Sequence, residues 1–461
     1  MFTTAKLIYF FYNNKILKVL LILSIILSLY SISFLLSSNN YTILAQQDLE
    51  TIKYRNMVID LGDGIKTNAQ LTIPAVGNGP FPGVLLIHGS GPVDMNETLG
   101  IVRIDNETGT KIYPSARPFF QIAEYLSDRG FVVLRYDKRG IGGNFTILDT
   151  NVWGNATTKD FKHDAEKALD ILIQQPEVDA NRITVLGHSE GTTIAPRVAI
   201  DNPDKVKNIV LMGTLAQNFS KIAEFQGVSL PLLYAKEVLD HTHDGLLSLQ
   251  EANKNPVFTT MVGNLTLLLT QNITNNASDI TSINASTPSS SSQQLNPKYN
   301  TNNDVYVDID KELKPKLLEN IKSFSVVKSG EKCIGIGKSC PIWVRAGFAL
   351  EPNLDIIGNV ASNTSILILQ GENESQTPLQ QAFLLQQKLT EVKHPDHTLI
   401  TYPNLGHAFY PSSEWQTDIG PIEQYVLRDI YSWLEAHNGF TPLTTSSLSS
   451  LLSSDNTELN H

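Results

Sequence analysis

The chain has 461 residues, of which 41% are hydrophobic, and its formal net charge is −11. That hydrophobic fraction is normal for globular proteins, so the chain can bury a large core and is not disordered as a whole. The negative charge argues against a nucleic-acid-binding protein, which needs clustered lysine and arginine. Two cysteines exclude a disulfide scaffold and a multi-cysteine zinc module.

Residues 19–36 form an uncharged, largely apolar run near the N-terminus. Its length lies at the border between a membrane-spanning helix and a long signal-peptide core. Three lysines precede the run, and the next basic residue is Lys53. Because the positively charged flank of a membrane segment usually stays on the cytoplasmic side, the chain after this run is expected to face outward from the cell. Residues 1–45 are therefore predicted to be a signal peptide or a membrane anchor, and the protein to be secreted or membrane-anchored facing outward.

Two further patterns agree with export. Cys333 and Cys340 frame the short loop CIGIGKSC, and in an oxidising compartment we expect them to form a local disulfide. N-x-[ST] glycosylation sequons begin at Asn96, Asn106, Asn144, Asn155, Asn218, Asn264, Asn272, Asn276, Asn284 and Asn363. An Asn/Ser/Thr-rich chain also produces such sequons by chance, so they predict glycosylation less firmly than the apolar run predicts export.

From residue 52 the sequence alternates between strand and helix patterns. The predicted strands are short apolar runs at Lys53–Leu61, Asn68–Pro74, Gly83–His88, Phe131–Asp137, Arg182–His188, Lys207–Gly213, Ser365–Gln370 and His397–Tyr402. The predicted helices cover Ala116–Arg129, Lys159–Gln175, a segment from Glu190, Pro378–Val392 and Ile419–His437. Such alternation indicates an α/β fold with a mostly parallel sheet flanked by helices.

The alternation stops for about 140 residues and then resumes. In between, helical patterns at Lys221–Leu239 and Lys311–Ser325 surround a stretch rich in Asn, Ser and Thr, which predicts a loop or disorder. The middle of the chain is therefore predicted to be an insertion into one domain. The expected organisation is a core at 52–214 and 359–437, a cap at 215–358 with a low-complexity stretch at 272–303, and a flexible tail at 438–461.

A G-x-S-x-G pattern, Gly187 to Gly191, stands between a predicted strand and a predicted helix. In this context the turn is so tight that small residues must flank the serine, and its hydroxyl is held exposed above the sheet. The helix N-terminus behind it favours an anion that forms there. Ser189 is therefore the predicted nucleophile.

A serine nucleophile needs a base, and the base needs an orienting acid. In folds with this turn the chain order is serine, acid, histidine. His407 follows the last predicted strand and is the predicted base. Two acids, Glu372 and Glu374, follow the strand Ser365–Gln370, and both are within reach in principle.

An oxyanion hole needs two backbone N–H groups aimed at one point. One is expected to be that of Glu190, directly after the nucleophile. The other is expected from the loop His88-Gly89-Ser90-Gly91-Pro92, with Ser90 as the donor. Glycines there let the backbone approach a substrate closely, and His88 is expected to support the turn by hydrogen bonding.

These motifs together resemble the α/β-hydrolase superfamily, and most closely its carboxylesterases of the HGSGP/YDKRG/GHSEG type, which are grouped with serine aminopeptidase-like hydrolases. The motifs that carry the resemblance are 88–92, 136–140, 187–191 and 406–407, and it covers about residues 52–214 and 359–437. The resemblance implies an α/β-hydrolase fold with an inserted cap. In that family the acid stands three residues after the glycine that ends its strand, which favours Glu374. The family usually has Asp at that position. It also often has a glycine directly after the G-x-S-x-G turn, where this chain has Thr192.

The function that this pattern predicts is an exported serine hydrolase that cleaves small-molecule carboxylic esters through a Ser-His-Glu triad. A serine exopeptidase on the same triad is the first alternative, although the cap has no adjacent pair of glutamates to hold an α-amino group. A non-catalytic surface binding protein is the second. The mechanism uses protein groups alone, so neither a metal nor an organic cofactor is expected. The sequence does not determine the oligomeric state.

Overall fold

The computed structural model describes residues 51–105, 109–270, 298–299, 305–325 and 341–439. Thr51–His461 form one compact unit. The predicted N-terminal segment, most of the low-complexity stretch and of the tail, and both cysteines lie outside the described residues. In the ranges given above, no helix is both long and apolar enough to cross a membrane.

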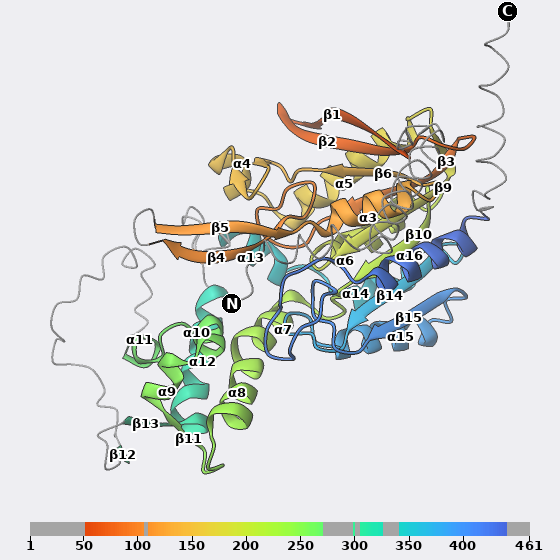
Figure 1. Ribbon diagram of the computed structural model, residues 1–461. Coiled ribbons are helices and arrows are strands. Elements are labelled where there is room, and N and C mark those ends of the chain that lie inside the picture. The colour runs from red at the N-terminus through yellow and green to blue at the C-terminus, as the bar shows by residue number, and fades with distance from the viewer. Residues whose placement is uncertain (1–50, 106–108, 271–297, 300–304, 326–340, 440–461) are drawn as a thin grey trace, which may run out of the picture. The chain divides into compact units, whose positions relative to one another are not determined.

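An eight-stranded sheet lies at the centre of the described residues, in the order β1-β2-β6-β3-β9-β10-β14-β15 (Figure 1). The strands are β1 Ile52–Gly62, β2 Ile65–Pro74, β3 Phe81–Ile87, β6 Val132–Tyr136, β9 Val178–His188, β10 Val206–Met212, β14 Ser365–Gly371 and β15 His397–Tyr402. β1 and β2 form an antiparallel hairpin, β2 pairs antiparallel with β6, and the other strands are parallel. The predicted fold class, a mostly parallel sheet within an α/β fold, is therefore confirmed.

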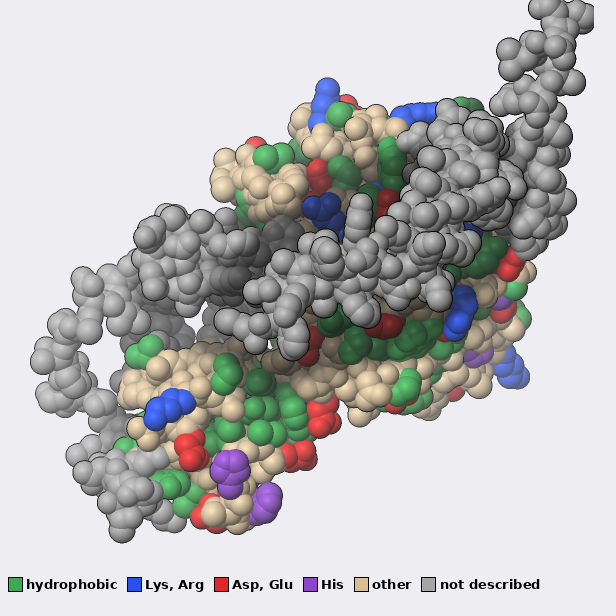
Figure 2. Space-filling view, viewed as in Figure 1, with side chains coloured by type: hydrophobic (Ala, Val, Ile, Leu, Met, Phe, Trp, Pro, Cys, Tyr) green, Lys and Arg blue, Asp and Glu red, His purple; other side chains and the backbone are tan. Residues whose placement is uncertain are grey.

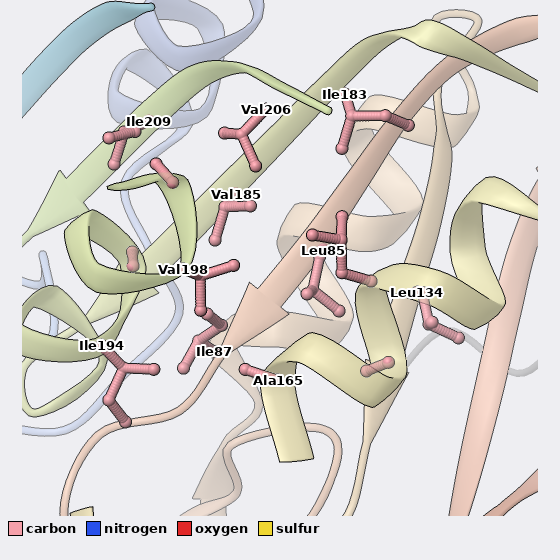
Figure 3. Close-up of a cluster of buried hydrophobic side chains, with 14 of the residues drawn as sticks. Leu85, Ile87, Leu134, Ala165, Ile183, Val185, Ile194, Val198, Val206 and Ile209 are labelled. Atoms are coloured by element: carbon pink, nitrogen blue, oxygen red, sulfur yellow. The ribbon is translucent and has the colours of Figure 1, made fainter. Parts of the chain in front are cut away.

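Helices cover both faces of this sheet. They are α3 Pro118–Ser127, α5 Thr158–Ile173, α6 Gly191–Asp201, α15 Gln380–Glu391 and α16 Gln424–His437. Because successive strand residues point to opposite faces, Leu85 belongs to a buried cluster with side chains of α5, α6 and α15, whereas Leu86 belongs to a second cluster with side chains of α3 and α16. Figure 3 shows the first of these layers, where Val198 of α6 lies against Val185 of β9.

Three helices begin two or more residues later than the sequence predicts, in each case near a proline. α3 begins at Pro118 and not at Ala116, because proline suits the first turn of a helix and Ala116 still belongs to a strand. α16 begins at Gln424 and not at Ile419, and Pro421 lies in the segment that stays non-helical. α15 begins at Gln380 and not at Pro378.

Two strands begin three or more residues earlier than the sequence predicts. β9 begins at Val178, four residues before the predicted start at Arg182, and β2 begins at Ile65, three residues before Asn68. The sequence also did not predict several small elements: the hairpin β4 Leu99–Asp105 and β5 Gly109–Ala116, the short strands β7 Ile141–Gly142 and β8 Thr146–Ile147, and α4 Thr150–Gly154.

The inserted segment between β10 and β14 has its own apolar cluster, which includes Phe258 and Val307. Its first helical run is α7 Phe219–Glu224, η2 Phe225–Ser229, α8 Leu230–Tyr234 and η3 Ala235–Leu239, where the η segments are π-helical. The rest comprises β11 Leu246–Ser248, α9 Leu249–Lys254, α10 Pro256–Val262, α11 Leu265–Thr270, β12 Lys298–Tyr299, β13 Val305–Asp308, η5 Ile309–Leu313, α12 Lys314–Ser325 and α13 Pro341–Phe348. α14 Asn353–Ile356 and the 3-10 turn η6 Ile357–Asn359 follow, and Ile357 is already buried in the core of the sheet.

The surface carries both signs of charge. On the part of the described surface visible in Figure 2, acidic and basic side chains are interspersed among polar and apolar ones. Such a surface gives no electrostatic footprint for a polyanion on that face.

Candidate active site

Ser189 lies in a tight turn between β9 and α6, at the carboxyl end of the parallel strands. Its φ is +52°, in the left-handed region that side-chain-bearing residues rarely adopt. The turn needs glycine at the positions two residues before and two residues after Ser189. A Cβ on Gly187 would lie 2.2 Å from the carbonyl oxygen of Gly191, and a Cβ on Gly191 would lie 2.2 Å from that of Ile87. The G-x-S-x-G pattern is thus a steric requirement of the turn.

His407 lies in the loop after β15 and contacts His188, the residue that precedes Ser189 in the turn. The two imidazole centroids are 4.8 Å apart, and Nε2 of His188 donates to the carbonyl oxygen of His407 at 3.0 Å. Gly213, which directly follows β10, makes room for the ring. A Cβ there would lie 2.9 Å from Cε1 of His407.

Of the two candidate acids, the one beside the imidazole is Glu374. Its Oε2 lies 2.9 Å from Nδ1 of His407, and its side chain is fully buried. Its Oε1 accepts the backbone N–H groups of Gln376 at 2.8 Å and Thr377 at 3.1 Å, so the carboxylate cannot rotate freely. Glu372 instead accepts a hydrogen bond from Thr401 on the exposed side. With Nδ1 bonded to Glu374, Nε2 is the ring nitrogen of His407 left to act as a base.

The two expected oxyanion donors are both free to bind a ligand. In the part of the chain that the structure describes, the amide N–H groups of Ser90 and Glu190 have no protein acceptor. The Ser90 loop runs close to the nucleophile, since a Cβ on Gly89 would lie 3.1 Å from Cβ of Ser189. His88 is buried and bonds the carbonyl oxygen of Tyr136 through Nε2. Burial and the nearby Lys138 ammonium lower the pKa of His88 to about 4, so it is a neutral donor that supports the loop.

A second histidine–carboxylate pair, which the sequence did not indicate, lies behind the serine turn. Nδ1 of His188 is 3.0 Å from Oε1 of Glu97, and the same carboxylate oxygen accepts the N–H of Gly89 at 2.6 Å. Burial lowers the pKa of His188, but the charge of Glu97 and the hydrogen bonds to the ring outweigh it, and the net pKa is raised. Burial likewise opposes ionisation of Glu97, yet its pKa is lowered overall by His188 and Gly89. The pair therefore favours a buried imidazolium beside a carboxylate.

A small hollow, partly open to solvent, lies between the sheet domain and the inserted segment. Its lining includes Glu190 and Thr193 beside the serine turn, and Phe219 and Trp343 from the insertion. Among the residues that the structure describes, no group of three or more His, Asp, Glu or Cys side chains is placed to hold a metal ion.

Comparison with known proteins bears on the same residues. The model of the family described as "alpha/beta hydrolase fold" matches residues 84–413, a span that contains Ser189, Glu374 and His407. The chain belongs to this α/β-hydrolase family. The resemblance that the sequence motifs implied is confirmed at this level.

Two curated relatives of this α/β hydrolase are named as esterases. Esterase EstD of Thermotoga maritima is 35% identical over 157 residues, which are 34% of this chain and 32% of that protein. Esterase FrsA of Yersinia enterocolitica is 25% identical over 199 residues, which are 43% of this chain and 40% of that protein. The chain thus spans less than half of the length of these relatives. Among solved structures, proline iminopeptidase from Mycobacterium smegmatis aligns with a TM-score of 0.45 at 14% identity, over 83% of this chain and 99% of that one.

Proposed function

We propose that this α/β hydrolase is a serine esterase that cleaves carboxylic esters through an acyl-enzyme. The observation that carries the proposal is the buried hydrogen bond between Glu374 and Nδ1 of His407, beside the strained turn that presents Ser189. A hydroxyl, an imidazole and a carboxylate are the groups that acyl transfer by this mechanism needs. The esterase names of the two curated relatives support the same class of reaction.

In the first half of the reaction, Nε2 of His407 takes the proton of the Ser189 hydroxyl while the serine oxygen attacks the ester carbonyl carbon. The carbonyl oxygen becomes an oxyanion, which accepts hydrogen bonds from the amides of Ser90 and Glu190. Glu374 keeps the proton of His407 on Nδ1 and stabilises the imidazolium. When the intermediate collapses, the alcohol leaves with the proton from Nε2, and the acyl group stays on Ser189.

In the second half, water attacks the acyl carbon and gives a proton to Nε2 of His407. A second oxyanion forms in the same place. Its collapse releases the carboxylic acid and returns the proton to the oxygen of Ser189. The imidazole of His407 carries the proton in each step, so the cycle restores the starting protein and consumes only the ester and one water molecule.

The test compares the full chain on p-nitrophenyl acyl esters and on aminoacyl-anilides, each as kcat/KM. We expect the esters to react faster, with a pre-steady-state burst of p-nitrophenol. Ser189→Ala is expected to lose this activity. Ser127→Ala removes another buried serine hydroxyl, which donates to the carbonyl oxygen of Thr72, and is expected to keep the activity. Faster turnover of the anilides would favour an exopeptidase, and no turnover of either substrate class would favour a non-catalytic binding protein.

We also propose that the protein is exported, with residues 1–45 as a signal peptide or an outward-facing anchor. The uncharged run at 19–36, preceded by lysines, supports this. Cell fractionation of the full chain and of a chain that lacks residues 1–45 tests it. The full chain is expected in the membrane or the medium and the shortened chain inside the cell; a full chain that stays in the cytosolic fraction would contradict export.

A further inference from the structure

A buried ion pair joins Lys138 to Glu190, the residue whose amide is one of the two proposed oxyanion donors. Nζ of Lys138 lies 3.0 Å from Oε2 of Glu190, and the exposed fractions of the two side chains are 3% and 5%. The same Nζ donates a hydrogen bond to the carbonyl oxygen of Gly89 and faces the ring of Phe161, 4.6 Å from its centroid. The Lys138 ammonium is thus shared between the loop after β3 and the serine turn.

The bond to Gly89 fixes the direction of an amide that the proposed mechanism uses. The carbonyl of Gly89 and the N–H of Ser90 belong to one planar peptide group and point in opposite directions. An ammonium that holds the oxygen therefore aims the N–H of Ser90. The N–H on the other side of Gly89 is held by Glu97 at 2.6 Å, so this glycine is fixed at both of its peptide groups.

The other end of the ion pair belongs to the second donor. Glu190 carries the second oxyanion amide, and its side chain is bound to Lys138 through Oε2. Its remaining oxygen, Oε1, accepts a hydrogen bond of 2.5 Å from the indole Nε1 of Trp343. Trp343 lies on α13 of the inserted segment and packs edge-on against Phe219 of α7, with ring centroids 5.1 Å apart. A side chain of the insertion is therefore bonded directly to the residue after the nucleophile.

Stability alone is a weak reason for this arrangement. Removing two charges from water costs free energy that their attraction often fails to recover, and apolar residues of similar volume are frequently as good or better. A second buried pair, Arg139 with Asp164, lies one residue further along the chain and has no hydrogen bond to Gly89 or Glu190. The two pairs are similar in burial and differ in whether they contact the residues of the oxyanion hole.

We propose that Lys138 and the Glu190 carboxylate are positioning residues, which keep the amide N–H groups of Ser90 and Glu190 directed at one point. Through its hydrogen bond to Glu190, Trp343 makes the geometry of this oxyanion hole depend on how the inserted segment packs against the sheet domain. The inference rests on the proposed esterase function. It assigns a role to the lysine of the YDKRG motif and to the glutamate of the GHSEG motif, which the triad itself does not use.

The experiment measures kcat and KM on a p-nitrophenyl ester, together with the inhibition constant of an aryl trifluoromethyl ketone, which forms a tetrahedral oxyanion on the serine. Loss of one oxyanion donor lowers kcat by about 10²–10³-fold. For Lys138→Met, which leaves the Ser90 amide present but no longer aimed, we expect a fall in kcat of roughly 10–100-fold with KM nearly unchanged. The ketone's inhibition constant is expected to rise by the same factor, since it binds through the same amides.

Trp343→Phe keeps an aromatic ring at this position and removes the indole N–H with the pyrrole ring that carries it, so it serves if Lys138→Met does not fold. We expect it to lower kcat by roughly tenfold or less, about the value of one hydrogen bond, and to weaken the ketone in proportion. The matched control is Arg139→Met/Asp164→Asn, which removes the neighbouring buried pair. It is expected to lower the stability to urea and to leave kcat and ketone binding within about twofold of the wild-type values.

Folded Lys138→Met or Trp343→Phe with wild-type kcat and ketone binding would overturn the inference. So would a control variant that loses kcat and ketone affinity to the same extent as Lys138→Met. A wild-type chain that hydrolyses no ester would instead overturn the proposed function, and with it the inference. The two failures are distinguishable because the second is seen in the wild type alone.

Discussion

Replacing Glu374 by glutamine tests how the acid works, because the structure fixes which way the new amide must point. Oε1 of Glu374 accepts the N–H groups of Gln376 and Thr377, and only a carbonyl oxygen can take that place in Glu374→Gln. The NH₂ group is then left facing Nδ1 of His407, where Oε2 now lies at 2.9 Å. It donates to Nδ1 and moves the ring proton to Nε2, so the imidazole can no longer accept the proton of Ser189.

The expected loss in kcat is about 10⁴-fold, the size seen when a triad histidine is held in the wrong tautomer. This corresponds to about 5.5 kcal/mol of transition-state stabilisation. The assay is steady-state hydrolysis of a p-nitrophenyl ester, with circular dichroism as the check on folding. Glu372→Gln is the matched control, because that carboxylate bonds only the exposed Thr401 hydroxyl among the described residues and should leave kcat unchanged. A folded Glu374→Gln within tenfold of wild type, or a larger loss in Glu372→Gln, would refute the assignment of the acid.

Two further predictions concern stability. Gly191→Ala places a Cβ 2.2 Å from the carbonyl oxygen of Ile87 and should lower the free energy of unfolding by about 3 kcal/mol or more. The control is Gly143→Ala, which has open space around its Cβ and should change the free energy of unfolding little. Equal urea midpoints for the two variants would contradict this prediction. Glu97→Gln removes the partner of a buried imidazolium and should cost about 3 kcal/mol near pH 6. The raised pKa of His188 contributes stability below about pH 6.5 and loses it as the pH rises through the raised value, while the lowered pKa of Glu97 contributes above about pH 4.3. The cost of Glu97→Gln should therefore be largest between these values and should fall as the pH rises through the raised pKa of His188. A cost that instead grows as the pH rises above about 6.5 would contradict the assignment.

The strands of the parallel sheet could be predicted from sequence because each is a short apolar run between helical patterns. The run His397–Tyr402 coincides with β15, and Lys207–Gly213 differs from β10 by one residue at each end. The pairing of β4 with β5 was missed, although two short runs on either side of a Gly-containing segment of the sequence carried a signal for it. The Gly and Pro residues of these two strands interrupt the apolar alternation on which strand prediction depends.

The site could be predicted only where a local motif carries the chemistry. G-x-S-x-G marks its own turn, since the steric reason for both glycines lies within a few residues. The contacts that support it are remote in the chain: Lys138 reaches Gly89 across 49 residues, and Trp343 reaches Glu190 across 153. No spacing rule predicts such pairs, because they depend on which loops the sheet order brings together.

In the insertion, the predicted helical patterns Lys221–Leu239 and Lys311–Ser325 coincide with helical runs of the structure, from α7 to η3 and from η5 to α12. Its small sheet and the helices α9, α10, α11 and α13 were missed. The three strands are at most four residues long, and the missed helices have six to eight residues. Such elements are too short to give a periodic pattern of their own. They are stabilised by the shared apolar cluster around Phe258, which forms only when the segment folds.

The central claim is that Ser189 is an activated nucleophile at this site. Its most direct test is to react the full chain with a fluorophosphonate probe and to locate the adduct by peptide mass spectrometry. One adduct is expected, on Ser189; it should be absent in Ser189→Ala and should form much more slowly in His407→Ala. An adduct on another residue, or undiminished labelling of Ser189→Ala, would contradict it.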